Sequence, residues 1–287
     1  MRSLGPVLVV LAAICALWYL AAIWMNAAWV NDQAAREGRE VFLVDLVTET
    51  LMQERPVLPA PHQVAKGLYD GVFGQAVTSK RSLVYHGWVT LSATLLGFAI
   101  GSAAGILLAV GIVYNRAMDL SVMPWAIASQ TIPILAIAPM IIVVLNSLGI
   151  TGIVPKAIIS AYLSFFPVVV GMVKGLRSPD AMQLDQMRTW NASGMQTLGK
   201  LRLPASMPYL FASLKVGVAA SLVGTIVGEL PTGAVAGLGS RLLSGSYYGQ
   251  TIQIWAALFA AALLAASLVA LIGGLERVTL KRMGLAR

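Results

Sequence analysis

The chain has 287 residues, of which 58% are hydrophobic and only 11% are charged, against about 25% in an average soluble domain. This composition excludes an ordinary water-soluble protein and predicts a membrane protein. The single cysteine, Cys15, allows no intrachain disulfide, and the two histidines, His62 and His86, form no pattern typical of a metal site.

Apolar runs of about 20 residues, the length that crosses a bilayer as a helix, recur along the chain. Six such runs are found, at 6–25, 83–113, 122–145, 153–173, 207–227 and 251–274. The first run is longer than the apolar part of a typical signal peptide, so we expect a retained helix. The sequence therefore predicts an all-α polytopic membrane protein with six transmembrane helices. We expect residues 1–81 to hold the first helix and an external segment, and residues 82–287 to form a five-helix core.

The net charge of +8 has an uneven distribution that indicates topology. If the N-terminus is cytoplasmic, the loop 146–152 is external and has no Lys or Arg, and the external loop 230–250 has only Arg241. The basic residues then gather in cytoplasmic segments, as the positive-inside rule requires. We expect a bacterial inner-membrane protein with both termini in the cytoplasm. Because the basic excess follows topology, nucleic acid is not expected as a partner.

The longest polar region, residues 26–81, separates the first two apolar runs. Within it, Gln33–Met52 has apolar residues at spacings of three and four, which predicts an amphipathic helix. The prolines of Arg55–Pro61 then predict an extended linker. Two interpretations stay open: a helix on the outer membrane surface, or a contact for an external partner.

Two kinds of pattern inside the apolar runs bear on packing and transport. Gly97, Gly101 and Gly105 recur every fourth residue, which indicates close contact between helices. The third and fourth runs are interrupted by prolines next to polar residues, as a substrate path requires, although kinked helices with local hydrogen bonds have the same pattern. The candidate path residues are Gln130, Thr131, Tyr162, Ser164 and Glu229, the last at the end of the fifth run.

Residues 178–206 form a polar and basic segment between apolar runs. A short helix is predicted to start at Pro179-Asp180 and to place Leu184, Met187 and Trp190 on one face. Asn191 suits a chain reversal, because Asn tolerates positive φ better than most residues. A second helix is expected from Ser193 to Leu203, with Pro204 ending it. Such a pair lies on lipid headgroups or docks a protein.

The same segment contains Gly194–Lys200, which matches a phosphate-binding P-loop except that Leu201 replaces the final Ser or Thr. A P-loop needs that hydroxyl for Mg²⁺ and a strand before the loop. We interpret the match as chance and expect no ATP at this site.

The segment resembles the cytoplasmic signature of binding-protein-dependent ABC importer permeases. That signature is Glu-Ala-Ala, three residues, Gly, nine residues, an aliphatic residue, any residue, and Leu-Pro. Asp185 takes the acidic position, Gln186 and Met187 take the alanine positions, and Asn191 takes the glycine position. Leu203-Pro204 completes the pattern. Within the superfamily, the chain is similar to the nitrate/sulfonate/taurine-type permeases over about residues 56–280.

The resemblance implies a type I ABC importer permease fold with cytoplasmic coupling helices. It implies two permease subunits, two ATPase subunits that bind ATP and Mg²⁺, and an external solute-binding protein. This chain is then not an enzyme and has no cofactor of its own. The second permease is either an identical copy or a related chain with the standard signature. An ion-coupled secondary transporter or channel is the alternative. It predicts ionisable residues inside the membrane for coupling, and the candidates we assign, Glu229 and Lys215, both lie near span ends.

Overall fold

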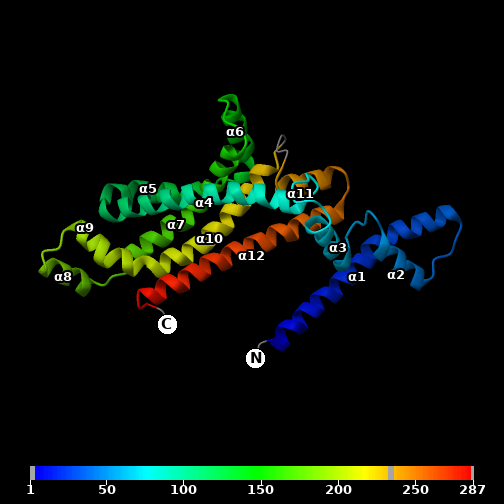
Figure 1. Cartoon of the computed structure of the whole chain (residues 1–287), viewed down its shortest axis with the longest axis horizontal. Coiled ribbons are helices and arrows are strands. Elements are labelled where there is room, and N and C mark those ends of the chain that lie inside the picture. Colours follow the sequence, from blue (N-terminus) through cyan, green and yellow to red (C-terminus); the bar gives the residue numbers. More distant parts are fainter. Residues whose placement is uncertain (1–3, 232–235, 286–287) are drawn as a thin grey trace. The chain divides into compact units, whose positions relative to one another are not determined.

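The computed structural model describes residues 4–231 and 236–285, and every regular element in this part is a helix (Figure 1). In chain order the helices are α1 (Leu4–Glu37), α2 (Leu43–Met52), α3 (Pro61–Val72), α4 (Leu83–Tyr114), α5 (Arg116–Ser129), α6 (Ile134–Ser147), α7 (Ile153–Leu176), α8 (Ala181–Thr189), α9 (Gly194–Thr197), the π-helix η1 (Leu198–Arg202), α10 (Leu203–Glu229), α11 (Leu238–Tyr247) and α12 (Thr251–Arg282).

Five helical segments of the described chain are long and apolar enough to cross a membrane: 5–37, 83–114, 153–176, 194–229 and 251–282. The expected third span is instead two helices, α5 and α6, bent by 99° at Gln130–Pro133. Pro133 cannot donate a backbone hydrogen bond and disfavours helical geometry in the residue before it, which explains the break. Counted as one broken span, the pair brings the number to six. The all-α polytopic fold is confirmed.

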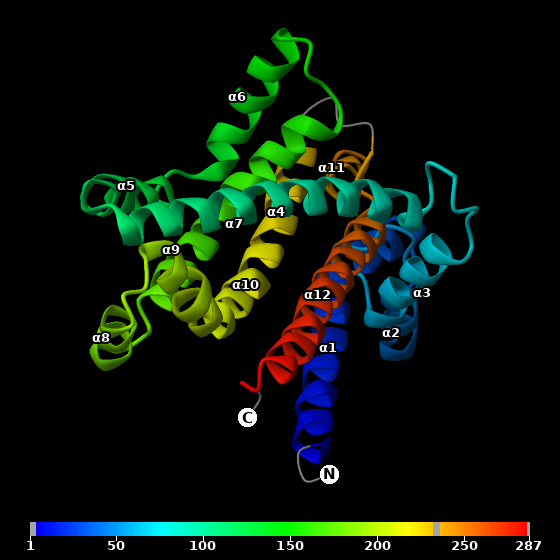
Figure 2. The same cartoon turned by 60° about the vertical axis from the view of Figure 1, so that its left-hand side comes forward.

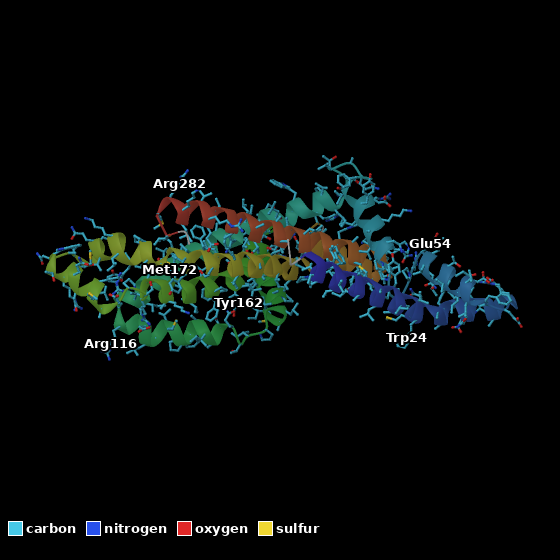
Figure 3. The ribbon with its side chains drawn as sticks, turned by 90° about the horizontal axis from the view of Figure 1, so that it is seen from below. Trp24, Glu54, Arg116, Tyr162, Met172 and Arg282 are labelled. Carbon is cyan, nitrogen blue, oxygen red and sulfur yellow. The ribbon has the colours of Figure 1, made fainter. Side chains whose placement is uncertain are left out.

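The chain forms two compact units, which are described separately. The first comprises residues 1–86 and 240–261, and the second comprises residues 87–239 and 262–287. Figure 3 labels Trp24 and Glu54 in the first unit, and Tyr162 and Met172 in the second. The boundary predicted after residue 81 lies close to the first division of the chain, but residues 240–261 belong with the N-terminal unit.

In the first unit, the helix expected over Gln33–Met52 is wrong as one element. The α1 helix continues to Glu37, the chain turns at Gly38 with φ of +66°, and α2 starts at Leu43. Arg39 lies in the turn and forms ion pairs with Glu37 at 2.8 Å and Glu49 at 2.7 Å. The hydrogen bonds from Arg39 also hold the pKa of Glu49 below its ordinary value.

The linker after α2 is not helical, but it bends at residues 54–55 and 57–58 rather than running extended as predicted. Side-chain hydrogen bonds fix it to α1. The buried Asn26 side chain donates to the Leu58 carbonyl at 2.9 Å and accepts from the Val57 N–H at 2.8 Å. The Trp18 indole donates to the Pro59 carbonyl at 3.0 Å. Pro61 then opens α3, because a proline suits the first turn of a helix, where its missing N–H has no partner to lose.

In the second unit, α4, α7 and α10 pack against one another (Figure 2). A β-carbon added at Gly97 would lie 2.5 Å from Ala157 O, and one added at Gly101 would lie 2.2 Å from Ser164 Oγ. At Gly105 it would lie 2.9 Å from Phe165 O. The glycine repeat therefore brings α4 against α7, as its spacing predicted. Near one end of this contact, Ala109, Ile112, Val169, Met172 and Leu176 form a buried apolar cluster.

Hydroxyl groups join the three helices where their side chains are fully buried. Ser160 Oγ lies 2.5 Å from Ser221 Oγ, which links α7 to α10. Thr94 Oγ1 donates to Thr225 Oγ1 at 3.0 Å, which links α4 to α10. In lipid, small residues and interhelical hydrogen bonds replace the hydrophobic driving force available in water.

Candidate functional site

The segment 178–206 folds as two short helices whose starts are fixed by capping boxes. At α8, the Asp180 side chain accepts from the Gln183 N–H at 2.8 Å, and the Gln183 side chain accepts from the Asp180 N–H at 3.2 Å. At α9, Ser193 and Gln196 form the same reciprocal pair at 3.3 and 2.8 Å. Each pair satisfies backbone N–H groups that have no partner inside a helix. The predicted start of the first helix is confirmed.

Asn191 reverses the chain between α8 and α9. It is the one described non-glycine residue with positive φ, at +51°. Its N–H donates to Arg188 O at 2.8 Å, and the Ala192 N–H donates to Met187 O at 3.0 Å. These two bonds form a Schellman motif, in which a left-handed residue ends a helix. Asn191 therefore makes the turn that a glycine makes in the signature.

The second helix does not end at Pro204, so that expectation is wrong. The chain runs from α9 through the π-helix η1 directly into α10, and Pro204 lies in the first turn of α10. The Leu203 N–H donates to Leu198 O, five residues earlier, as a π-turn requires. The wider turn ahead of Pro204 relieves the clash that a proline ring makes with the preceding helical turn. The segment is thus continuous with a predicted span.

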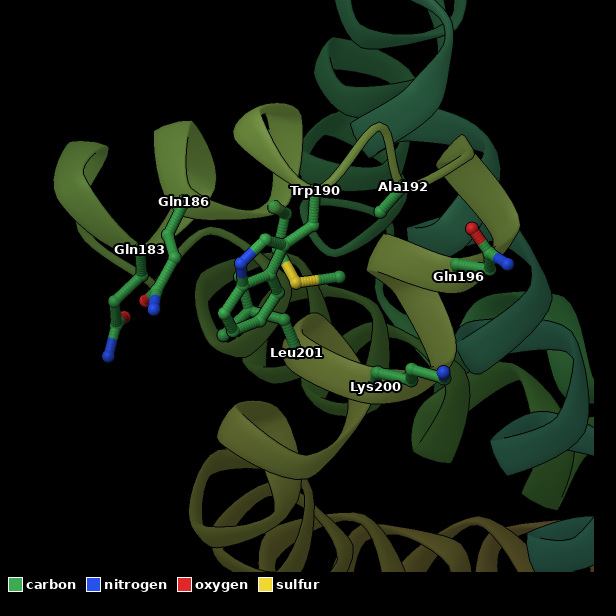
Figure 4. Close-up of a pocket in the computed structure, with 8 residues that line it drawn as sticks. Gln183, Gln186, Trp190, Ala192, Gln196, Lys200 and Leu201 are labelled. Atoms are coloured by element: carbon green, nitrogen blue, oxygen red, sulfur yellow. The ribbon is translucent and has the colours of Figure 1, made fainter.

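Between the two helices lies a cavity of about 430 Å³ (Figure 4). Its lining is uncharged except for one lysine: Gln183, Gln186, Met187, Trp190, Ala192, Gln196, Lys200 and Leu201. The Trp190 ring points toward Leu201 across the cavity. The near-P-loop residues are helical here, and no strand precedes them in the described chain. We name the cavity and the exposed residues of α8 and α9 around it the α8–α9 surface.

The α8–α9 surface exposes large apolar side chains beside a local ion pair. Trp190 is 66% exposed, and Met182 and Met195 are each 76% exposed. Asp185 forms an exposed ion pair with Arg188 at 2.9 Å. Met187, in contrast, is only 8% exposed. The two residues in the alanine positions both line the cavity, but Gln186 is exposed to solvent, whereas Met187 is buried.

Residues that the sequence did not single out hold the α8–α9 surface to the spans. Arg202 donates to the Leu176 carbonyl at 2.7 Å, and its guanidinium lies 5.6 Å from the centre of the Tyr114 ring. The Tyr114 hydroxyl donates to Gly194 O at 3.0 Å. The ends of α4 and α7 thereby support α9 and η1. In the sequence, the signal that could have indicated this anchoring role was an arginine, Arg202, at the variable position of the Leu-x-Leu-Pro motif.

The structure brings three of the candidate path residues together. Tyr162 donates its hydroxyl to the Ser129 carbonyl, next to the exposed Gln130 and Thr131 at the break between α5 and α6. Ser164 lies elsewhere, fully buried against Gly101, where its hydroxyl donates to Ala161 O in its own helix. Glu229 is also separate, at the end of α10. Membership of a path stays a prediction for all five residues.

Glu229 is fully buried and is the centre of a polar cluster, which we name the carboxylate cluster. Thr90 Oγ1 lies 3.0 and 2.9 Å from its two oxygens, and the Gly239 N–H donates to it at 2.9 Å. Lys156 Nζ lies 3.6 Å from its Oε1 and donates to Ala236 O at 2.9 Å. The cluster joins α4, α7 and α10 to the residues that lead into α11.

Comparisons with known proteins agree with this architecture. The model of the family described as binding-protein-dependent transport system inner membrane component matches residues 101–284. A riboflavin transport system permease protein of Chloroflexus aurantiacus is 31% identical over 225 residues, which are 78% of this chain and 80% of the relative. A probable ABC transporter permease protein of Haemophilus influenzae is 30% identical over 202 residues, 70% of this chain and 77% of the relative. A formylaminopyrimidine transport permease protein of Halalkalibacterium halodurans is 29% identical over 226 residues, 78% and 85%.

The fold and the α8–α9 segment thus define a permease, a membrane-embedded component of a transport system. The chain belongs to the binding-protein-dependent transport system inner membrane component family and is a permease subunit of an ABC importer. It is an integral inner-membrane protein, and its relatives are named as permease proteins of ABC, riboflavin and formylaminopyrimidine transport. The ion-coupled alternative finds no support.

Proposed function

We propose that the α8–α9 surface docks the ABC ATPase and couples its closure to movement of the spans. Supporting this are the exposed Trp190 and Met195 beside a cavity in a segment at the signature position. Exposed aromatic and Met side chains around a cavity are typical of protein interfaces. The coupling residues are Asp185, Gln186, Met187, Trp190, Asn191, Leu203 and Pro204. ATP and Mg²⁺ bind the ATPase, and this chain hydrolyses nothing.

The observation that carries the proposal is the unbroken helical path from the surface into a span. Residues 194–229 run through α9, η1 and α10 without a loop, and α10 packs along α7. A displacement at α9 is therefore passed to α10 through continuous helix, with no loop between them to absorb it. Differential binding of nucleotide by the ATPase then shifts the balance between inward-open and outward-open forms.

Two ATPase subunits and two permease subunits complete the transporter, and we favour a homodimer of this chain. Two of the three departures from the signature keep the packing and the turn of the segment. Met187 is turned inward, and Asn191 adopts the left-handed conformation of the glycine it replaces. Gln186 and Asn191 are both exposed, so the side chains at the surface differ from the standard signature at these two positions. Because the packing and the turn are kept, a second permease with the standard signature is not needed, although a heterodimer is the alternative.

The orientation that fits this role places both termini in the cytoplasm and residues 26–81 outside. Basic residues of the α8–α9 segment and of the C-terminal end of α12 then lie in the cytoplasm, as the positive-inside rule expects. A solute-binding protein approaches the external side.

The transported solute is a small polar molecule, and we propose a neutral heterocycle. Two relatives are named for riboflavin and formylaminopyrimidine transport. The path residues at the break between α5 and α6, Gln130, Thr131 and Tyr162, are all uncharged. Thermal shift of the external binding protein tests this point: heterocycles are expected to stabilise it, and stabilisation by nitrate or sulfonates alone would overturn the assignment.

A paired substitution tests the coupling role. Asp185→Arg with Trp190→Ala is expected to abolish solute accumulation in membrane vesicles, while the amount of permease in the membrane stays unchanged. Trp24→Ala with Asp32→Arg is the matched control, because both residues are exposed on α1. Unchanged accumulation in the first pair would sink the proposal, as would equal losses in both pairs.

A further inference from the structure

A larger cavity, of about 620 Å³, lies within the first unit and is unrelated to the α8–α9 surface. Its walls come from the end of the linker, from α3 and the turn after it, and from the start of α11 and α12. The lining residues are Glu54, Arg55, Gly67, Asp70, Gly71, Gln75, Arg81, Leu83, Arg241, Gln250, Ile252, Gln253 and Ala256. The volume falls within the range of roughly 300–1,000 Å³ that is usual for small-molecule sites.

Three arginines line this cavity without a carboxylate partner. Arg55, Arg81 and Arg241 form no ion pair with any residue that the structure describes. Glu54 and Asp70 also line the walls, and neither forms an ion pair within the described part of the chain. Elsewhere in the same unit, Arg39 holds two carboxylates at once. The guanidinium N–H groups of these arginines are therefore not used in ion pairs and can bind an anion.

Arg241 is the most constrained of the three. It projects from α11 and is half-buried, and its Nε is buried with no hydrogen-bond partner. Burial lowers the pKa of Arg241, and the positive charge of Arg81 lowers it further. A buried donor without an acceptor and a nearby like charge both cost free energy. An anion between the two guanidinium groups relieves the repulsion between them.

The other walls suit an organic anion. Leu83, Ile252 and Ala256 give an apolar side, and the amide groups of Gln75, Gln250 and Gln253 add neutral polar groups to the lining. Gln253 is fixed, because its Nε2 lies 3.2 Å from both Arg241 O and Ser244 Oγ. A guanidinium matches the two oxygens of a carboxylate or phosphate with parallel hydrogen bonds, which an isolated ammonium does not.

We propose that this cavity binds an oxyanion, the carboxylate or phosphate group of a small organic anion, between Arg241 and Arg81. The site goes beyond the proposed function and does not depend on it, since neither the coupling surface nor the path residues take part. The oxyanion comes either from a free solute or from the phosphate of a lipid headgroup at the end of the spans.

The test uses the purified full chain in phosphatidylcholine nanodiscs, with citrate and inorganic phosphate as probes and chloride at matched ionic strength. Thermal unfolding, followed by tryptophan fluorescence, is expected to shift upward with citrate or phosphate in a saturable way, and not with chloride. Arg241→Gln is expected to raise the melting temperature of the anion-free protein, because the repulsion between the two arginines is gone. The same variant is expected to bind citrate or phosphate roughly tenfold more weakly, or worse. Arg39→Gln is the control and keeps the response.

Two further arms complete the test. If Arg241→Gln does not fold, the exposed Arg81→Gln replaces it with the same expected loss of response. In nanodiscs containing phosphatidylglycerol, a raised melting temperature and a lost citrate response identify the lipid as the source, whereas a retained response identifies a free anion. The proposal is overturned if neither probe nor phosphatidylglycerol stabilises the wild-type protein, or if the arginine variants respond like wild type.

Discussion

Lys156 on α7 and Glu229 at the end of α10 meet with Nζ and Oε1 3.6 Å apart, and both side chains are shielded from solvent. The pair is not isolated. Lys156 also donates to Ala236 O, and Glu229 accepts from Thr90 and Gly239. Because the partners belong to α4, α7 and α10, to the start of α11 and to Ala236 just before it, the pair fixes one end of the α4–α7–α10 packing.

Glu229→Ala is expected to destabilise the protein by about 3 kcal/mol, because Lys156 and Thr90 lose their buried acceptor. Lys156→Ala is expected to cost less, since Thr90 and Gly239 still bind the carboxylate. The double variant is expected to be more stable than the sum of the single effects predicts. Melting temperatures of the three variants in detergent measure this coupling, and additive losses would show that the two side chains do not interact.

Gly237→Ala is expected to disrupt the same cluster for steric reasons. Gly237 has φ of +129°, and a β-carbon there would lie 2.1 Å from Glu229 Cδ. Strain and displacement of the carboxylate together are expected to cost more than about 2 kcal/mol. Gly249→Ala is the control: φ is +62°, but a β-carbon meets nothing within 4 Å. Similar melting temperatures for the two variants would mean that the close approach to Glu229 does not matter.

Gly101→Ala tests the contact between α4 and α7. The added β-carbon would lie 2.7 Å from the Ala161 carbonyl oxygen, which is backbone and cannot rotate away. We expect a loss of about 1–3 kcal/mol from overpacking, read from the melting temperature. Gly87→Ala, on the same helix with open space around it, is expected to be neutral or slightly stabilising. The interpretation fails if the Gly101 variant is as stable as the Gly87 variant.

Asn191 should accept glycine and reject β-branched residues. Asn191→Gly keeps the left-handed turn and is expected to change stability by less than about 1 kcal/mol. Asn191→Val is expected to cost about 1–2 kcal/mol locally and to reduce transport, because it opens the reversal between α8 and α9. Solute accumulation in membrane vesicles and hydrogen exchange at Ala192, whose N–H closes the turn, measure both effects. Full transport with Val would contradict the turn's role.

The spans were predictable because hydropathy acts locally: a run of about 20 apolar residues has few alternatives to a membrane helix. The caps at Asp180 and the reversal at Asn191 were predictable for the same reason, since each depends on residues three or four positions away. The place of Pro204 inside a continuous helix was not predictable, because the π-turn before it lets the helix continue where a proline usually ends one. Likewise, Pro61 was interpreted as part of a linker, although it opens α3.

The carboxylate cluster could not be predicted from a single sequence. Glu229 stands out by its charge, but its partner Thr90 is 139 residues away along the chain. Helix α11 was also missed, since the glycines and polar residues of 238–247 are typical of a loop. In the sequence, Arg241 stood out only as the single basic residue of the predicted external loop 230–250. The cavity around it depends on contacts between distant segments.

Co-purification tests the central claim most directly, which is that the α8–α9 surface binds the ABC ATPase. Tagged permease is coexpressed with the ATPase and the bound ATPase is quantified. We predict that Asp185→Arg with Trp190→Ala reduces the recovered ATPase at least about tenfold, as loss of an interface hot spot would. The control pair Trp24→Ala with Asp32→Arg is predicted to recover as much as wild type. Equal recovery in both pairs would contradict the account.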